Sequence, residues 1–321
     1  MAVVMVLVAC SHQNNSTASI DSTGDIASIG EDGGLDNVMS LKGDVINGSA
    51  PKSDAAFDAL AAMGVKTIVS VDGARPDIEA ADERGMRYVH IPIGYDDVTP
   101  EEARQIALAL RDLPRPIYMH CHHGKHRGPA AIAVGMVCTG EMTNDEAVSF
   151  MEVAGTSHSY PGLFESAQSA RPIDWSGDVS RGDDLPEVVR VAGFVNAMSS
   201  IDRTWDRLKV IQTSQWQTPA NHPDLVPAAE AGMLVDLLRV SIESKYAVRP
   251  GSTGAMVASA DVDDMMAPPT AQITFNNMLS DALIAANGLE DSLVSGNAQA
   301  ADMWFTRLKS SCSACHEQFR N

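Results

Sequence analysis

A cysteine and an arginine are separated by five residues, with a glycine between them, in His120-Cys121-His122-His123-Gly124-Lys125-His126-Arg127. An apolar run precedes this segment and a helical pattern follows it, which predicts a loop between a strand and a helix N-terminus. Such a loop turns several backbone N–H groups inward and binds anions. Gly124 permits the tight turn, and Arg127 offers a planar fork to two phosphoryl oxygens. The same N–H groups favour a thiolate, so we expect Cys121 to be a nucleophile toward phosphate esters.

The charges near this segment also suit an anion. Between Leu113 and Gly140 the sequence contains no Asp or Glu. The basic and imidazole side chains of that window are Arg115, His120, His122, His123, Lys125, His126 and Arg127. In a chain with a net charge of -19, this window predicts a local anion pocket. The predicted phosphate-binding loop consists of His122, His123, Gly124, Lys125 and His126.

The motif resembles the HCxxGxxR signature of the dual-specificity branch of the protein tyrosine phosphatases, and the resemblance extends over residues 38–165. It implies a phosphomonoester hydrolase that forms a phosphocysteine on Cys121, with a phosphorylated protein or a small phosphoester as substrate. It also implies a general acid on an upstream loop. Asp96 takes that place here, because Asp97 lies closer to the next helix start and suits a capping role.

Two features depart from the family pattern. The family carries Ser or Thr directly after the arginine, where it helps the cysteine to leave, whereas this chain has Gly128. The loop is also rich in histidine, and its imidazoles offer an alternative role in binding a transition metal. A buried cysteine beside an unrelated arginine is the simplest alternative.

A second group of reactive residues, Cys312-Ser313-Ala314-Cys315-His316, lies near the other end of the chain. CxxCH is the attachment motif of c-type haem, in which two thiols form thioethers and the histidine is an axial ligand. On a helix these three side chains share one face. A thioredoxin-type pair would need a preceding strand, and a zinc site would need a fourth ligand. We therefore expect one covalent haem c on Cys312 and Cys315, with His316 on the iron.

The position of this motif in the last helix, followed by Phe319 and Arg320, resembles cytochrome c prime and its six-coordinate relatives over about residues 187–321. In that family the second axial position is open to small gases or is filled by a Met of the first helix. Met198 is the candidate here, although a Met on an apolar face is as often part of the core. The resemblance implies a redox partner or a small gas as ligand, and possible homodimers through this domain.

The N-terminus carries a short apolar run that ends in Leu7-Val8-Ala9-Cys10. It is too short to span a bilayer, and it resembles the lipobox of bacterial lipoprotein signals, in which the cysteine is acylated. Residues 11–37 are polar and rich in Ser, Asn and Gly, which is typical of a disordered tether. No Lys or Arg precedes the apolar run, so a frayed cytoplasmic start is the alternative. Because haem attachment occurs outside the cytoplasm, we expect a periplasmic, membrane-anchored lipoprotein.

The elements that must position these groups follow from hydrophobic periodicity. Apolar runs predict strands at residues 65–71, 87–93 and 116–121, and amphipathic stretches predict helices at 54–63, 79–85, 100–113, 129–137 and 144–153. Alternating strands and helices predict a mostly parallel sheet flanked by helices. Residues 166–187 break every period and predict a linker. Beyond it, four amphipathic stretches predict a four-helix bundle over 188–321.

Length and composition agree with two domains. The chain has 321 residues, 45% of them hydrophobic, which argues against wholesale disorder. The net charge of -19 argues against nucleic acid as a partner and leaves membrane contact to the lipid anchor. Cys138, in the apolar helix after the loop, is expected to be a core thiol.

The sequence as a whole predicts an extracytoplasmic cysteine-dependent phosphatase fused to a haem domain that transfers electrons or binds a gas. We also expect the haem domain to regulate the phosphatase, because a reactive thiolate is sensitive to oxidation. The alternative is a haem protein whose phosphatase-like domain binds phosphate without catalysis, which Gly128 favours.

Overall fold

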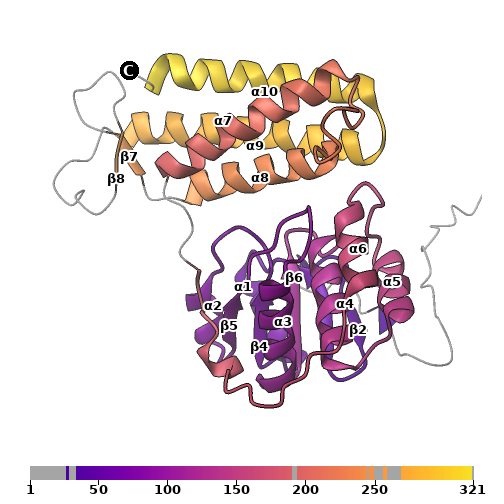
Figure 1. Cartoon of the computed structure of the whole chain (residues 1–321). Coiled ribbons are helices and arrows are strands. Elements are labelled where there is room, and N and C mark those ends of the chain that lie inside the picture. Colours follow the sequence, from indigo (N-terminus) through magenta and orange to yellow (C-terminus); the bar gives the residue numbers. More distant parts are fainter. Residues whose placement is uncertain are drawn as a thin grey trace, which may run out of the picture.

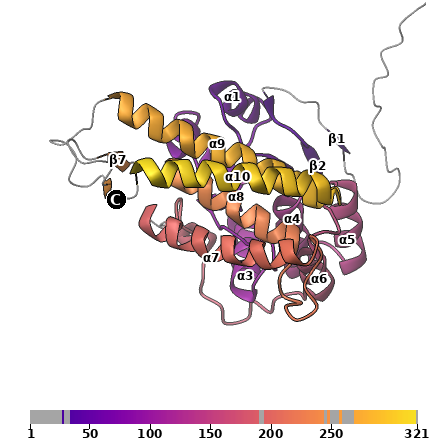
Figure 2. The same ribbon diagram turned by 90° about the horizontal axis from the view of Figure 1, so that it is seen from above.

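The computed structural model describes residues 27–28, 34–189, 194–243, 246–248, 256–258 and 269–319. An α/β domain comes first and a bundle of long helices follows it (Figure 1). The predicted fold class is therefore confirmed. Viewed from above, the bundle lies across the α/β domain (Figure 2).

The first domain is built on a six-stranded mixed sheet. Its strands are β1 (Ala27–Ser28), β2 (Met39–Leu41), β3 (Val45–Ser49), β4 (Thr67–Ser70), β5 (Arg87–His90) and β6 (Ile117–Cys121). The strand order is β1-β2-β3-β6-β4-β5, and β3, β6, β4 and β5 are parallel while β1 and β2 pair antiparallel. The parallel strands end at one edge, where β6 delivers Cys121.

Helices cover both faces of this sheet. They are α1 (Asp54–Ala62), α2 (Ile78–Asp82), α3 (Pro100–Asp112), α4 (Arg127–Thr139), α5 (Asn144–Val153) and α6 (Pro161–Ser169). Side chains of α1 and α2 form one core with Tyr118 and Ile68, whereas α3 to α6 form the other core with Met119 and Val69. This alternation along β4 and β6 is the period of two that a strand buried on both faces requires.

Local sequence signals account for where these helices begin. Thr99 and Glu102 form a reciprocal capping box at α3, with Pro100 in the first turn, and Thr143 and Glu146 form the same box at α5. Each box satisfies two backbone N–H groups that the first turn leaves without a helical partner. The predicted helices over 54–63, 100–113 and 144–153 agree with α1, α3 and α5 to within one residue at each end.

The second domain is a four-helix bundle, as the sequence predicts. Its helices are α7 (Phe194–Thr213), α8 (Pro227–Glu243), α9 (Pro269–Val294) and α10 (Ala298–Phe319). Between α8 and α9 a short antiparallel pair, β7 (Tyr246–Val248) and β8 (Met256–Ala258), was not predicted. The bundle core is made mainly of Leu and Ala. The Trp205 ring stacks on the Phe305 ring, with 4.2 Å between the ring centroids.

The connecting segments are more structured than the sequence suggests. Within residues 11–37, β1 pairs with β2, and Leu35 is fully buried against α1. Helix α6 continues to Ser169, inside the expected linker, and the remaining linker residues lie along the α/β domain. There Arg87 binds Asp183 at 2.8 Å and Arg104 binds Asp178 at 2.5 Å. Among the described helices, none has the length and apolarity to cross a membrane.

Candidate active site at the Cys121 loop

The Cys121 loop (residues 121–127) joins the end of β6 to the start of α4, as predicted. Gly124 has a φ of +68°, which favours glycine, and a Cβ there would lie 2.4 Å from the carbonyl carbon of Gly48. The loop is therefore pressed against the end of β3. The Asn47 side chain fastens it by donating to the Gly124 carbonyl oxygen at 2.8 Å. Sequence reasoning missed Asn47 because an Asn-Gly-Ser stretch is unusual for a buried strand.

The structure brings the two principal candidates to the same junction. Cys121 ends β6, Arg127 begins α4, and both side chains are buried. Gly128 lies beside the thiol, because a Cβ added at this residue would lie 3.6 Å from Cys121 Sγ and 3.0 Å from Asn47 Oδ1. The Oδ1 atom of Asn47 is buried and has no hydrogen-bond partner. A side chain at residue 128 would therefore lie within contact distance of both the thiol and this amide oxygen.

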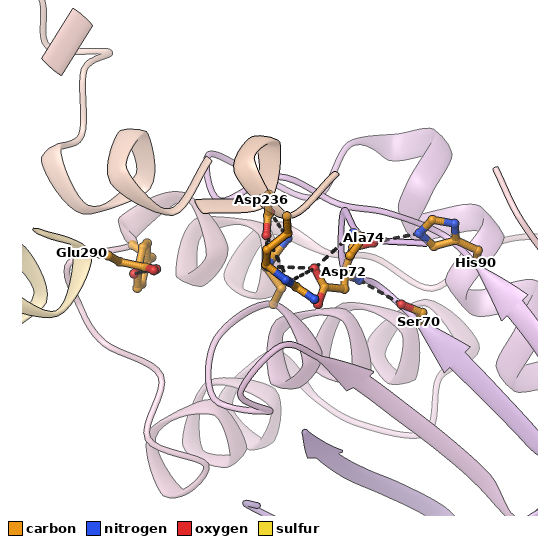
Figure 3. Close-up of polar contacts among 9 residues, drawn as sticks. Ser70, Asp72, Ala74, His90, Asp236 and Glu290 are labelled. Atoms are coloured by element: carbon orange, nitrogen blue, oxygen red, sulfur yellow. Dashed lines mark hydrogen bonds and ion pairs between the residues drawn. The ribbon is translucent and has the colours of Figure 1, made fainter. Parts of the chain in front are cut away.

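The guanidinium of Arg127 is held on three sides. Its plane lies over the Tyr95 ring at 4.2 Å, a favourable cation–π distance. Its Nη1 and Nη2 atoms donate to the two carboxylate oxygens of Asp236 at 2.5 and 3.2 Å (Figure 3). Nη2 also approaches Asp72 at 3.5 Å, while Nε is buried without a partner.

Asp72 links two arginines from different domains. It follows β4 and is almost fully buried, and Arg239 of α8 donates to both of its oxygens at 2.8 Å. Burial opposes ionisation of Asp72, but Arg239 and Arg127 outweigh it and hold the pKa of Asp72 well below its usual range. Asp72 is therefore a carboxylate that positions both guanidinium groups. In Figure 3 it lies below and to the right of Asp236 of α8.

These contacts correct the expectation of an acid-free pocket. The window around the Cys121 loop contains no acid in the sequence, but the fold brings Asp72 from β4 and Asp236 from α8 to Arg127. They lie 55 and 109 residues away along the chain. Sequence reasoning had no signal for Asp236 or Arg239, because both depend on how the domains dock. Asp72 could have been found from its sequence position, because it follows β4, a strand that pairs in parallel with β6 and ends at the same edge as Cys121.

The histidines of the loop contribute little positive charge. Burial lowers the pKa of His126 to about 4 and, with Arg239 nearby, that of His122 to about 2, so both are neutral near pH 7. Burial also lowers the pKa of His123, whose ring lies against that of His122 at 4.3 Å. Lys125 is exposed. In the described part of the chain, no three His, Cys, Asp or Glu side chains are arranged to hold a metal ion.

Asp96 lies on the loop before α3, next to Tyr95, whose ring meets Arg127. Its backbone carbonyl packs against Gly162, where a Cβ would overlap it. Burial raises the pKa of Asp96, and the opposing positive charge is Arg207 of α7. No contact joins the Asp96 carboxyl to the Cys121 loop among the interactions described. A carboxyl with a raised pKa is suited to donate a proton. Because no described contact ties it to the loop, the role of Asp96 as general acid stays a prediction.

The residues predicted to bind haem gather at the end of α10. Cys312 and Cys315 are partly buried free thiols, and His316 lies one residue further along the same helix. Burial raises the pKa of Cys312 to about 11 and also raises that of Cys315. Cys315 and Met198 of α7 pack against one apolar cluster, which consists of Phe194, Phe275, Leu279 and Phe319.

This set of donors fits a haem attached to α10. Two unlinked thiols and an imidazole lie on one helix, and a thioether faces the same aromatic cluster from α7. The site is distant from the Cys121 loop, because α8 faces the α/β domain while α10 lies on the outer side of the bundle (Figure 1). Cys138 is buried in α4, with a pKa raised by burial, as expected for a core thiol. Cys10 lies outside the described residues.

Comparison with known proteins gives matches only among solved structures, since no family model and no curated protein matches the chain. A putative phosphatase (DUF442) from Shewanella putrefaciens CN-32 is 16% identical, with a TM-score of 0.35, covering 41% of this chain and 87% of its own. TpbA from P. aeruginosa is 19% identical, with a TM-score of 0.39, covering 47% and 92%. A variant of TpbA in complex with pTyr is also 19% identical, with a TM-score of 0.37, covering 42% and 84%.

Proposed function

We propose that the α/β domain hydrolyses phosphomonoesters through a covalent phosphocysteine on Cys121. The Cys121 thiolate attacks phosphorus, the bond to the leaving oxygen breaks, and Asp96 gives that oxygen a proton. Asp96 then takes a proton from water, whose oxygen attacks phosphorus and releases inorganic phosphate and the thiolate. Arg127 and the N–H groups at the start of α4 stabilise the charge on the phosphoryl oxygens. A phosphorylated protein or a small phosphoester is the proposed substrate.

The observation that carries this proposal is the pairing of Arg127, at the end of the Cys121 loop, with a two-oxygen anion. The fork of Arg127 binds both oxygens of the Asp236 carboxylate from a buried position at the start of α4. Planar guanidinium groups bind carboxylate and phosphate with the same bidentate geometry. A phosphoryl group held on this fork would lie at the helix N-terminus next to Cys121, as attack by the thiol requires.

The proposal is tested by assaying an aryl phosphate with the wild type, Cys121→Ser and Cys138→Ala. Cys138 is the matched control, since it is the other buried cysteine of the domain and lies away from the loop. We expect loss of turnover in Cys121→Ser alone, and phosphorylation of Cys121 after rapid acid quench. Turnover that survives in Cys121→Ser would contradict the mechanism.

A second candidate function is phosphate binding without catalysis. Gly128 favours it, because the residue that touches the thiol has no hydroxyl to assist departure of the cysteine. In that case the wild type would bind inorganic phosphate at Arg127 but would show no turnover that depends on Cys121.

For the bundle, we propose one haem c, which Cys312 and Cys315 would attach and His316 would hold through its iron. Such a haem would supply electron transfer or binding of a small gas such as NO. Met198, which packs against the same cluster as Cys315, is the candidate for a second protein ligand, and the alternative is that Met198 is part of the core. Absorption spectroscopy after expression with the haem-attachment machinery tests this. Absence of a Soret band, or haem extracted by acid-acetone, would refute covalent attachment.

We further propose that the protein is an extracytoplasmic lipoprotein anchored through Cys10, and that the haem domain regulates the phosphatase. The basis is the lipobox-like N-terminus together with the CxxCH motif. Labelled fatty acid should enter the wild type and not Cys10→Ser. Equal phosphatase rates with ferric, ferrous and gas-bound haem would exclude the regulatory link.

A further inference from the structure

A carboxylate of the helical bundle occupies the anion-binding fork of the α/β domain. Asp236 of α8 accepts from Arg127 through both oxygens, and the side chains are 15% and 1% exposed respectively. The contact therefore lies at a buried domain interface. The Asp236 carboxylate accepts hydrogen bonds from the two terminal nitrogens of Arg127, which would otherwise donate to two phosphoryl oxygens.

The local charges make simultaneous binding of phosphate unfavourable. Arg127 and Arg239 carry two positive charges, which Asp72 and Asp236 balance within contact distance. A phosphoryl dianion added to this buried, neutral group would leave two uncompensated negative charges, and the cost of such charges at a buried site is high. One of the two carboxylates must therefore leave or take up a proton before a phosphate ester binds.

Asp236 is the carboxylate that can leave. Asp72 is held through both oxygens by Arg239, and its pKa is well below the ordinary value. Asp236 lies 3.5 Å from Arg239, so its close partner is Arg127 alone. Burial raises the pKa of Asp236, which means that its ionised form is stabilised less well in this position. Asp236 also belongs to α8 of the bundle, whereas Asp72 follows β4 of the sheet that carries Cys121.

The surfaces around the contact are shaped for close docking of α8. At Gly73, a Cβ would lie 3.3 Å from Asp236 Oδ2. At Gly232 on α8, it would lie 2.8 Å from the Tyr95 ring and 2.9 Å from Glu290 Oε1. Glycine on both sides lets the helix approach the Cys121 loop so that Asp236 reaches Arg127. A larger side chain at Gly232 would press against the Tyr95 ring and so push α8 away from the α/β domain.

We infer that Asp236 is an intramolecular substrate mimic, so that α8 closes the Cys121 loop and a phosphate ester competes with this carboxylate for Arg127. The inference rests on the proposed phosphate-binding role of Arg127. It makes the bundle a competitive inhibitor of the domain to which it is joined, and substrate access then depends on release of α8.

The first test measures binding of inorganic phosphate to the full chain by calorimetry, so that it does not depend on turnover. The proteins are the wild type, Asp236→Asn and the control Glu230→Gln, which changes a buried carboxyl of the same helix that pairs with Arg207 inside the bundle. We expect Asp236→Asn to bind phosphate about tenfold more tightly than the wild type, within the usual range of coupling between sites, and Glu230→Gln to be unchanged. Equal or weaker binding in Asp236→Asn overturns the inference.

Two further measurements test the inference even if Asp236→Asn does not fold. Gly232→Val should also tighten phosphate binding, since it displaces α8 and leaves Arg127 and Asp236 intact; unchanged affinity in this variant argues against closure by α8. A crystal structure of the wild type with tungstate should show the oxyanion on Arg127 and Asp236 displaced. Tungstate bound while Asp236 keeps both contacts overturns the inference. Loss of Cys121-dependent turnover in every variant, with tighter phosphate binding in Asp236→Asn, would refute the proposed catalysis but not the competition.

Discussion

The side-chain amide of Asn47 donates to the carbonyl oxygen of Gly124 at 2.8 Å and to that of Asn37 at 3.0 Å, which ties β3 to the turn of the Cys121 loop. The same side chain turns its other polar atom, Oδ1, toward Gly128 and the thiol. Asn47 is fully buried, so these contacts are not shared with solvent. The shape of the loop therefore depends on a residue of a neighbouring strand.

Replacing this amide should disturb both stability and catalysis. Asn47→Ala leaves the buried carbonyl oxygen of Gly124 and the partly buried one of Asn37 without this donor, and the buried one alone costs about 1–3 kcal/mol. We expect a lower free energy of unfolding in urea and a fall in kcat/KM of about tenfold or more, since misplacement of a catalytic group is costly. Asn144→Ala is the matched control, because Asn144 also donates to two carbonyl oxygens but far from the loop. Equal loss of activity in both variants would show that only stability matters.

Gly128 offers a gain-of-function experiment. Gly128→Ser places a hydroxyl beside Cys121 Sγ and within reach of the unpaired Oδ1 of Asn47, where it can assist departure of the thiolate in the hydrolysis step. We expect kcat in Gly128→Ser to exceed that of Gly128→Ala by about tenfold, a typical effect of one polar catalytic contact. The alanine variant has the same Cβ, 3.0 Å from Asn47 Oδ1, and so controls for crowding. Equal kcat values would exclude a role for the hydroxyl.

The assignment of the general acid is tested with leaving groups of different basicity. Asp96→Asn should lower kcat/KM for an alkyl phosphate by about a hundredfold, since its leaving oxygen needs a proton, and much less for a nitrophenyl phosphate. Because burial raises the pKa of Asp96, activity toward the alkyl ester should decline as pH rises through that pKa. Asp97→Asn is the neighbouring control. A larger effect in Asp97→Asn would transfer the role to that residue.

Buried carboxyls at the domain interface should make stability depend on pH. Burial raises the pKa of Glu290 from an ordinary 4.5 to about 7, although Tyr160 donates a hydrogen bond to it. The folded state then binds more protons than the unfolded state between these two values. The contribution of Glu290 is thus complete below about pH 4.5 and is lost as pH rises through about 7.

Thermal unfolding of the wild type and Glu290→Gln between pH 4.5 and 8 measures this contribution. Each unit of pKa shift corresponds to about 1.4 kcal/mol, so the wild type should lose about 3 kcal/mol relative to the variant over this range. Glu230, whose pKa burial also raises to about 7, contributes in the same direction and is unchanged in both proteins. Parallel stability curves for the wild type and Glu290→Gln would contradict the prediction.

The second haem ligand is tested with two methionines of the same cluster. Met198 of α7 and Met278 of α9 both pack against Phe275 and its neighbours. If Met198 is on the iron, Met198→Ala should convert a low-spin spectrum to a high-spin one and open a site for CO, whereas Met278→Ala should keep the wild-type spectrum. A high-spin wild type that binds CO would instead make Met198 a core residue.

Much of the architecture could be predicted because it depends on neighbours in the chain. The apolar runs before Cys121 and the capping residues Thr99 and Thr143 act within a few residues, and the elements that they define lie where they were expected. The short strand β3 was missed because its sequence, Val45–Ser49, includes Asn, Gly and Ser. These residues are favourable there only because the Cys121 loop and residues 36–37 complete their hydrogen bonds.

The sequence by itself determined the two reactive groups, since Cys121 and Arg127 stand at the two ends of one short loop and Cys312 and Cys315 lie on one helix. In both cases a short motif specifies the local geometry. Only the tertiary structure decided the electrostatics of the first group. Asp72 and Asp236 reach Arg127 from 55 and 109 residues away, and Arg239 arrives on the same helix as Asp236. Charge interactions depend on distance in space and on burial, not on separation along the chain. A segment without acids thus became a site in which two carboxylates balance two arginines.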